Sequence, residues 1–259
     1  MQLMVSGKSI KGIARGCNQD YFGLFPNDGM SEDNIYVLAD GMGGAVGGEL
    51  ASRSVVETII ECFPSVLEEL KLPVKAMEYS ILKANLSLRK HMINNPDLRG
   101  MGTTVVVLHF DQKKAYVAHV GDSCCYRIHA KRIEKITTDH SLVQELYQKG
   151  HLTLKQMQTH PKRNIITRAL GVEDTVEIDI NMRLIEKDDV FLLCSDGLNS
   201  VVAEEDMAEI VVRNIEDMEV MCGKLIDTAI ANNGTDDISV VAIRVVGVKR
   251  KGMWRMFGG

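Results

Sequence analysis

Aspartates recur beside small residues at the borders of short apolar segments, where their carboxylates could act as oxygen ligands. Strand ends are rigid, and a sheet can bring several of them together although they lie far apart in the sequence. Each aspartate taken singly has an ordinary alternative role as a turn or cap residue. As a group they predict one convergent cluster, made of Asp20, Asp40, Asp122, Asp196 and Asp236.

A cluster of this kind calls for divalent cations. Several carboxylates cannot share a small site as anions without compensating charge, because each raises the pKa of its neighbours. Hard divalent ions supply that charge, and carboxylate, carbonyl and water ligands suit Mg²⁺ or Mn²⁺ rather than Zn²⁺. Gly41 directly follows Asp40, and a glycine lets the backbone approach closely enough for its carbonyl to bind a metal. The pattern therefore predicts a magnesium or manganese site.

The glycine-rich segment 41–48 has two competing interpretations, a nucleotide loop and a flexible turn. A Walker loop is excluded because no Gly-Lys-Ser/Thr occurs in this segment. A dinucleotide fold is disfavoured because the next segment has helical spacing up to Pro64 instead of forming a second parallel strand.

Covalent catalysis by a side chain is also disfavoured. Ser123 and Ser195 lie in no GxSxG turn, and the last histidine, His160, precedes Ser195, which breaks the order of a hydrolase triad. The six cysteines contain no CxxC pair, so buried thiols in a reducing compartment are favoured over a disulfide or zinc framework.

The composition limits the possible partners and location. The chain has 259 residues and a formal net charge of -5, which argues against general nucleic-acid binding because phosphate neutralisation needs a clustered positive surface. No window approaches the roughly 20 apolar residues of a membrane span, and the N-terminus lacks the apolar core of a signal peptide. We therefore expect a cytoplasmic protein without a transmembrane segment.

The elements that must position the aspartates can be outlined from periodicity. Residues 34–40 predict a strand ending at Asp40, followed by amphipathic helices over 49–63 and 74–93. From Met101 onward, short alternating segments separated by turn residues predict an antiparallel meander.

The second half continues with an irregular surface segment over 139–170 that contains short helical pieces. Strands are then predicted over 176–184 and 189–195, helices over 203–213 and 217–233, and a final strand over 237–246. Strands precede and follow helix pairs without strict alternation, which favours an α+β fold with stacked antiparallel sheets.

The order and wording of the motifs resemble one known family. The segments are "ARGCNQD", "VLADGMGG", "MGTTVVV", "AHVGDSCCYR", "TTDHSLV", "ITRALG", "FLLCSDGL" and "TDDISVVAI". In sequence and spacing they resemble the metal-dependent PPM-type (type 2C) serine/threonine protein phosphatases, specifically the compact bacterial form. The resemblance covers residues from about 8 to 247.

This resemblance implies an α+β fold that is a four-layer α-β-β-α sandwich, with two antiparallel β-sheets flanked by pairs of helices. It implies a single catalytic domain over residues 1–247 with a flap at about 140–165, and a basic and aromatic tail at 248–259. In the flap, Lys162 and Arg163 are candidate contacts for acidic substrates, with ordinary solvated charge as the alternative.

The resemblance also implies roles for the cluster. Asp40 would bridge two Mn²⁺ or Mg²⁺ ions and Gly41 would contribute its carbonyl. Asp196 and Asp236 would hold one of the ions, and Asp20 would support the other, largely through water.

Two further positions complete the implied site. Asp122 matches a ligand for a third metal ion, acting with Asp196. Arg15 matches the arginine that grips the substrate phosphate, in keeping with the fit between a guanidinium fork and phosphate oxygens. The catalytic residues would thus be Arg15 and Asp40.

Three positions depart from the family pattern. Met42 stands where many relatives carry a histidine proposed as general acid, so the leaving group must be protonated by a metal-bound water or by another group. Gln19 replaces a glutamate, which removes a negative charge near the second ion. Asp237 replaces an asparagine and could offset that loss if it lies near the site.

The function implied is hydrolysis of phosphoserine and phosphothreonine in protein substrates by direct attack of a water that bridges two divalent ions. A bacterial Ser/Thr kinase would be the counterpart, and a monomer is expected. Two alternatives are a pseudophosphatase that serves as a regulatory binding module and a phosphatase of one dedicated phosphorylated regulator.

Overall fold

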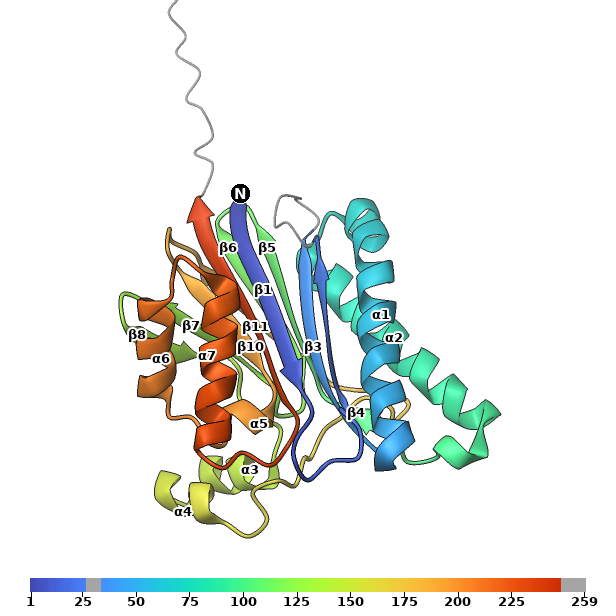
Figure 1. Ribbon diagram of the computed structural model, residues 1–259. Helices are drawn as coiled ribbons and strands as arrows, with labels where there is room; N and C mark the ends of the chain where they lie inside the picture. The colour runs from blue at the N-terminus through green and yellow to red at the C-terminus, as the bar shows by residue number, and fades with distance from the viewer. Residues whose placement is uncertain (27–33, 248–259) are drawn as a thin grey trace, which may run out of the picture.

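Two antiparallel sheets lie face to face at the centre of the protein, and helices cover the outer face of each (Figure 1). The computed structural model describes residues 1–26 and 34–247. One sheet has the order β1-β11-β10-β7-β8 and the other β2-β3-β5-β6-β9, with β4 paired to β3. The predicted α+β, α-β-β-α sandwich is therefore confirmed.

The elements have the following bounds. The first sheet contains β1 (Gln2–Ile10), β7 (Cys124–His129), β8 (Arg132–Lys135), β10 (Val190–Cys194) and β11 (Ile238–Gly247). The second contains β2 (Asp20–Phe25), β3 (Ile35–Met42), β4 (Gly102–Thr103), β5 (Val105–Asp111), β6 (Lys114–Val120) and β9 (Asp179–Leu184). The helices are α1 (Gly44–Leu70), α2 (Pro73–Asn94), a 3-10 turn (Pro96–Leu98), α3 (Leu142–Gln148), α4 (Leu154–Thr159), α5 (Asp196–Asn199), α6 (Glu204–Arg213) and α7 (Met218–Ala231).

The core has three layers of apolar side chains, one between the sheets and one under each helix pair. Strand β3 shows how they are supplied. Ile35, Val37 and Ala39 pack under α1 and α2, whereas Tyr36 and Leu38 pack between the sheets. A strand buried on both faces appears in the sequence as a continuous apolar run, which is why the strand could be predicted but not its orientation.

Helix α1 is longer than the sequence predicted. The expected end at Pro64 is wrong, because the helix continues to Leu70. A proline inside a helix removes one backbone hydrogen bond and costs about 3 kcal/mol. Here Phe63 is fully buried, and Val66 and Leu67 pack against the same apolar layer. Burial of these side chains offsets the cost of the proline.

The predicted single meander is divided between the two sheets. Strands β5 and β6 pair in one sheet, and β7 and β8 pair in the other. The chain crosses over at residues 121–123, where Gly121 has φ of +104° and its Cα faces Thr104 so closely that a Cβ would lie 2.6 Å from a side-chain carbon. This crossing places Asp122 at the gap between the sheets.

Two strands at the beginning of the chain were not predicted. β1 pairs with β11, with Ile10 opposite Ile238, and β2 pairs with β3, with Asp20 opposite Asp40. The start of β2 therefore places one acidic residue beside another.

The long segment between β8 and β9 agrees with the outline from the sequence. Residues 139–170 form an irregular segment that contains α3 and α4. All six cysteines are free thiols.

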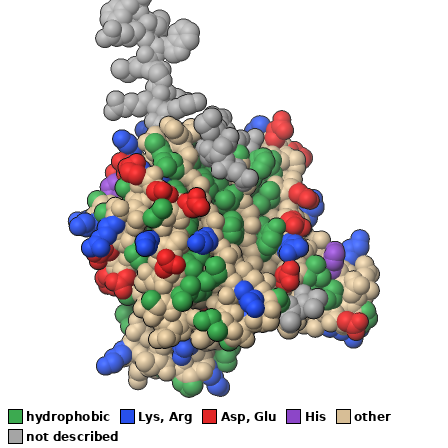
Figure 2. Space-filling model, viewed as in Figure 1, with side chains coloured by type: hydrophobic (Ala, Val, Ile, Leu, Met, Phe, Trp, Pro, Cys, Tyr) green, Lys and Arg blue, Asp and Glu red, His purple; other side chains and the backbone are tan. Residues whose placement is uncertain are grey.

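Basic and acidic side chains are interspersed over the described part of the face in Figure 2. None of the described helices combines the length and apolar character that a membrane crossing requires. The basic and aromatic tail predicted at 248–259 lies outside the described residues.

Candidate active site

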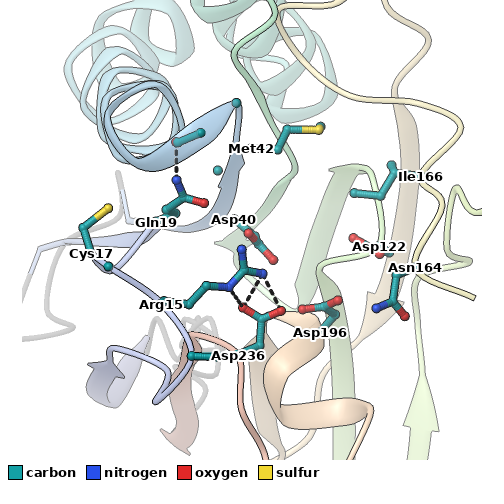
Figure 3. A pocket seen from close by; sticks show the side chains of 15 residues that line it. Arg15, Cys17, Gln19, Asp40, Met42, Asp122, Asn164, Ile166, Asp196 and Asp236 are labelled. Carbon is teal, nitrogen blue, oxygen red and sulfur yellow. Dashed lines mark hydrogen bonds and ion pairs between the residues drawn. The ribbon is translucent and has the colours of Figure 1, made fainter.

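A pocket of about 370 Å³ opens where strands from both sheets end, and it brings most of the predicted site residues together. Asp40, Asp122, Asp196 and Asp236 line it, and Figure 3 shows their carboxylates around a common space. Arg15 and Gly41 line the same pocket. Asp20 does not line the pocket; its side chain is buried and interacts electrostatically with Asp40 and Asp196.

The backbone of Asp40 is held by two threonines. Thr104 Oγ1 accepts the amide of Asp40 at 3.0 Å, and the Thr104 amide donates to the Asp40 carbonyl at 2.9 Å. Thr103 Oγ1 donates to the same carbonyl at 2.8 Å. The segment "MGTT" helped to reveal the family resemblance, but its role in positioning Asp40 becomes visible only in the structure.

Gly41 lies against the first turns of α1. A Cβ at this position would lie 1.9 Å from the Gly48 carbonyl oxygen, which is far inside van der Waals contact. The Gly41 amide donates to the Gln19 carbonyl at 3.0 Å. Only glycine fits between β3 and the helix, and this close packing fixes the backbone that carries Asp40.

Asp20 is tied to the other sheet through two serines. Ser195 Oγ donates to Asp20 Oδ2 at 2.7 Å, and the Ser239 amide donates to Ser195 Oγ at 3.0 Å. Oδ1 of Asp20 is buried without a hydrogen-bond partner among the described residues. One oxygen of this carboxylate is thus fixed and the other is available.

Asp196 and Asp236 come from neighbouring strands of the first sheet. Asp196 begins α5 directly after β10, and Asp236 precedes β11. Arg15 donates from Nε to Asp236 Oδ1 at 2.7 Å and from Nη2 to Oδ2 at 2.6 Å. This two-pronged bond raises the pKa of Arg15 above its usual value, so the guanidinium stays charged.

Asp122 lies in the turn that crosses between the sheets. Its side chain is buried, and its Oδ1 has no hydrogen-bond partner among the described residues. A buried carboxylate oxygen without a partner is rare in proteins because its desolvation is not compensated. This oxygen is therefore a second candidate ligand position.

The electrostatics of the cluster reflect crowding of like charges. Burial is the main cause that raises the pKa of Asp20 to about 7, of Asp122 to about 7 and of Asp196 to about 6, and neighbouring carboxylates add to it. Burial and the nearby Asp20 raise the pKa of Asp40 well above its usual range. In the absence of added positive charge the cluster would hold protons.

The three departures from the family pattern have different positions. Met42 lines the pocket, and its thioether cannot donate a proton. The Gln19 side-chain amide donates to the Gly44 carbonyl at the start of α1. Asp237 is not among the pocket-lining residues, and both of its oxygens accept backbone amides. Asp237 is thus not a pocket ligand, although its charge still acts on the buried Asp20 and on Arg15.

The flap contributes two residues that sequence reasoning did not single out. Asn164 and Ile166 line the pocket, directly after the predicted contacts Lys162 and Arg163, which are exposed. Neither an asparagine nor an isoleucine carries a chemical signal of its own in a polar loop, so no pattern in the sequence could have indicated them.

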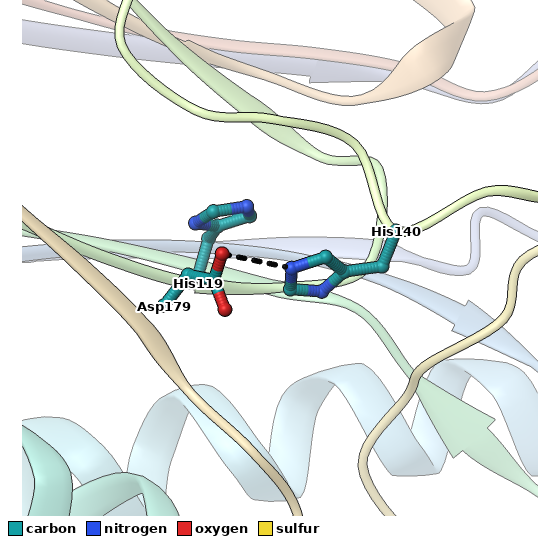
Figure 4. Close-up of side chains that lie close together, drawn as sticks. All are labelled: His119, His140 and Asp179. Atoms are coloured by element: carbon teal, nitrogen blue, oxygen red, sulfur yellow. Dashed lines mark ion pairs between the residues drawn. The ribbon is translucent and has the colours of Figure 1, made fainter. Parts of the chain in front are cut away.

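A second group of possible ligands, His119, His140 and Asp179, does not form a convincing metal site (Figure 4). The two rings are stacked at 20° with centroids 4.6 Å apart, whereas a metal ion lies in the plane of each imidazole that binds it. His140 Nδ1 accepts the Gly121 amide at 3.1 Å, and the Arg168 guanidinium lies 2.8 Å from Asp179. The Arg168 guanidinium already supplies positive charge to this group, and we assign the three residues a structural role.

The comparisons with known proteins agree with the geometry. The family model described as protein phosphatase 2C matches residues 13–222. The chain is 34% identical to serine/threonine phosphatase stp of Listeria monocytogenes over 239 residues, covering 90% of this chain and 92% of that protein. Stp1 of Staphylococcus aureus has a similar structure, with a TM-score of 0.87, 31% identity and coverage of 95% and 96% of the two chains.

A further solved structure bears on the metal chemistry. The catalytic domain of the serine/threonine phosphatase PstP, in complex with 2 manganese ions, matches with a TM-score of 0.81 and 28% identity, covering 95% of this chain and 99% of that one. The match extends over the elements that carry the aspartate cluster. On the family model, the sequence relatives and the shared fold, this chain belongs to the protein phosphatase 2C family of metal-dependent serine/threonine phosphatases.

Proposed function

We propose that this chain removes phosphate from phosphoserine and phosphothreonine in protein substrates, with Mn²⁺ or Mg²⁺ bound by the aspartate cluster. The observation that carries the proposal is the convergence of four carboxylates and Arg15 on one pocket. Carboxylates provide the hard oxygen donors that these ions prefer, and an arginine fork suits phosphate.

The residues present fit divalent cations. Two buried carboxylate oxygens, Asp20 Oδ1 and Asp122 Oδ1, have no partner among the described residues, and burial and crowding disfavour their anionic form unless positive charge is added. In this proposal Asp40 would contact both core ions, the Gly41 carbonyl would add a further oxygen ligand, and Asp196 and Asp236 would hold one of the ions.

The remaining ligands follow the same reasoning. Asp20, which is buried beside the cluster and does not line the pocket, supports the second core ion through water. Asp122 and Asp196 hold a third ion. Cations bound in this way supply the Lewis acidity that activates water and neutralises phosphate charge.

Arg15 binds the substrate phosphate in this proposal. Its two donor groups already engage the two oxygens of Asp236, which is the same fork geometry that two phosphate oxygens require. The Arg15 side chain is 44% exposed, so it can reach a phosphate that enters the pocket from solvent.

Water, and no side chain, attacks phosphorus in this proposal. Ser195 is fully buried and donates to Asp20, and Ser123 is buried against Thr104. Neither hydroxyl is presented to the pocket. The described pocket-lining residues include no histidine, and in this proposal the proton for the leaving group comes from a metal-bound water or another group.

Several properties of the whole protein belong to the same proposal. A Ser/Thr kinase is the functional counterpart, because serine and threonine phosphorylation must precede its removal. We also propose a cytoplasmic location, a monomeric state and a single catalytic domain over residues 1–247.

The decisive experiment measures hydrolysis of p-nitrophenyl phosphate and of a phosphothreonine peptide with Mn²⁺, with Mg²⁺ or with a chelator. The parent is compared with Asp40→Asn and Asp236→Asn, and with Asp227→Asn on the exposed face of α7 as the matched control. We expect activity only with metal, a loss of at least about a hundredfold for the two site variants, and normal activity for the control.

Other outcomes would reject specific parts of the proposal. Activity that survives chelation would contradict the metal-dependent mechanism. Normal activity in either site variant would remove that aspartate from the site. A folded parent that binds Mn²⁺ but hydrolyses neither substrate would support the binding-module alternative.

A further inference from the structure

Residues 11–19, here called the Arg15 loop, carry the chain from β1 in one sheet to β2 in the other. The two ends of the loop are buried at Gly12 and Gln19, whereas its middle is exposed and the Ile13 side chain is 83% exposed. Arg15 lies in this exposed middle. Its position therefore depends on how the two ends are fixed.

Asp237 holds both ends of the loop. Its Oδ1 accepts the Gly12 amide at 2.8 Å, and its Oδ2 accepts the Gln19 amide at 2.8 Å. The side chain is only 3% exposed. Hydrogen bonds from amides to a buried carboxylate are stronger than neutral ones, so one side chain closes the base of the loop from the inside.

Other contacts of the loop lead to the same short segment of the chain. The Ala14 amide donates to the Thr235 carbonyl at a longer 3.3 Å, and the Arg15 side chain bonds to Asp236. A Cβ on Gly12 would lie 2.3 Å from the Asp236 carbonyl carbon. The segment that precedes β11 thus supplies both a carboxylate of the cluster and the support of the arginine loop.

We propose that Asp237 is a positioning residue that sets the place of Arg15 for phosphate binding. The inference rests on the proposed role of Arg15 in binding the substrate phosphate. It requires both carboxylate oxygens, because an asparagine has one acceptor oxygen and would turn its NH₂ group toward the second backbone amide. Asp237→Asn therefore keeps the shape of the side chain but opens one end of the loop.

The first test is kinetic and uses a double-mutant cycle. For Asp237→Asn, kcat/KM for p-nitrophenyl phosphate falls about tenfold and the inhibition constant of inorganic phosphate rises by a similar factor, because misplacement of a binding group weakens its contacts. In an Arg15→Ala background, Asp237→Asn has less than about a twofold further effect, since the two residues act through one contact.

The matched control is Asp217→Asn at the start of α7. Asp217 also accepts two backbone amides, but both bond to Oδ1 alone, so an asparagine keeps them. We expect normal kinetics and normal phosphate inhibition for this variant.

The second test measures the exchange rates of backbone amides in the Arg15 loop by NMR, with the protein in its Mg²⁺ form. The Gly12 and Gln19 amides are protected in the parent, and at least one exchanges at least about tenfold faster in Asp237→Asn. Unprotected amides in the folded parent would overturn the inference without need of any variant.

The remaining outcomes separate the inference from the proposed function. Unchanged phosphate inhibition in Arg15→Ala refutes the role of Arg15 and with it this inference. A loss in Arg15→Ala together with normal Asp237→Asn overturns the inference alone. Multiplicative effects in the double-mutant cycle would show that Asp237 acts independently of Arg15, through Asp236. A fall in Mn²⁺ affinity equal to the fall in kcat/KM would also show that Asp237 acts through Asp236. Either result overturns the inference.

Discussion

Two segments border the pocket, and they are attached to the sheets in different ways. The Arg15 loop is fixed at both ends by one buried carboxylate and packs against the start of β11. The flap, at about 140–165, closes mainly at its own base, since the Leu142 amide donates to the Ile165 carbonyl and Ser141 pairs with Ile166. Helix α4 buries none of its residues and α3 buries only Val143.

We relate this difference in attachment to two tasks, binding of the phosphate group and recognition of the rest of the substrate. A phosphate group is the same in every substrate, so the residue that grips it benefits from a fixed position. The sequence around the phosphate differs among substrates, and a surface segment with few buried contacts can adapt to it at little cost to stability. Substitutions in the two segments should therefore have effects of different size and kind.

The largest difference is expected between Arg15→Ala in the loop and Asn164→Ala in the flap, which both line the pocket. Arg15→Ala should lower kcat/KM for p-nitrophenyl phosphate about 10²- to 10³-fold, because it removes a charged donor to the reacting group. Asn164→Ala should lower it less than about tenfold. Steady-state kinetics at saturating Mn²⁺ measure both values, and equal losses would show that the flap takes part in the chemistry.

The next difference concerns backbone packing and compares Gly12→Ala with Gly150→Ala. A Cβ on Gly12 would overlap the backbone of Asp236, so we expect a loss of about 1–3 kcal/mol in the free energy of unfolding together with reduced activity. Gly150 has φ of +75° with open space around it, so alanine should cost about 1 kcal/mol and leave activity intact. Urea unfolding and aryl phosphate assays test the pair. A fully active and stable Gly12→Ala would contradict the close packing of the loop.

A smaller effect is expected at the root of the flap, where His140 is buried against His119, Arg168 and Asp179. Burial, with His119 and Arg168, lowers the pKa of His140 to about 4. Between its unfolded value of 6.5 and about 4, only the unfolded chain takes up a proton there, so stability falls as the pH falls through this range.

The His140→Asn variant isolates this contribution, because asparagine can still accept the Gly121 amide but does not titrate. Between pH 7 and pH 4 the parent should lose about 1–2 kcal/mol more unfolding free energy than the variant. The carboxylate cluster has raised pKa values and therefore contributes stability as the pH falls, opposite to His140. Both proteins share this contribution, so the comparison cancels it. Parallel pH curves for the two proteins would show that His140 is protonated in the folded state.

The smallest effect is expected for Lys162→Ala and Arg163→Ala in the exposed part of the flap. Each should lower kcat/KM for an acidic phosphopeptide less than about fivefold, because exposed ion pairs contribute about 1 kcal/mol or less. The loss should disappear at high salt, and p-nitrophenyl phosphate hydrolysis should not change. An equal loss with both substrates would move these side chains from substrate contact to the catalytic site.

The aspartate cluster could be predicted because its members stand where strands end. Asp40 lies near the end of β3, Asp122 and Asp196 follow strands, Asp236 precedes one, and strand ends converge when sheets stack. The apolar runs and helical spacing also indicated most elements. What the sequence did not reveal is which sheet a strand joins, because β6 and β7 are both apolar and only tertiary packing separates them.

Residues that act through the backbone were the hardest to predict. Thr103 and Thr104 hold Asp40 through its amide and carbonyl, and nothing in their identity distinguishes them from other threonines in strands. The sequence left open whether Asp237, which follows Asp236, lies near the metal site. Asp236 lies in a bend and lines the pocket, whereas Asp237 accepts the Gly12 and Gln19 amides of the Arg15 loop.

The pairing of β1 with β11 has a consequence for the order in which the enzyme forms during synthesis. β1 leaves the ribosome before the other described strands, yet its only sheet neighbour among them is β11, which is synthesised after all the others. Asp236 and Asp237 immediately precede that last strand, so the nascent chain has neither a complete cluster nor a closed Arg15 loop. Contacts between such distant segments form slowly. The growing chain therefore stays inactive toward phosphoproteins around it until nearly all of the described chain has been synthesised.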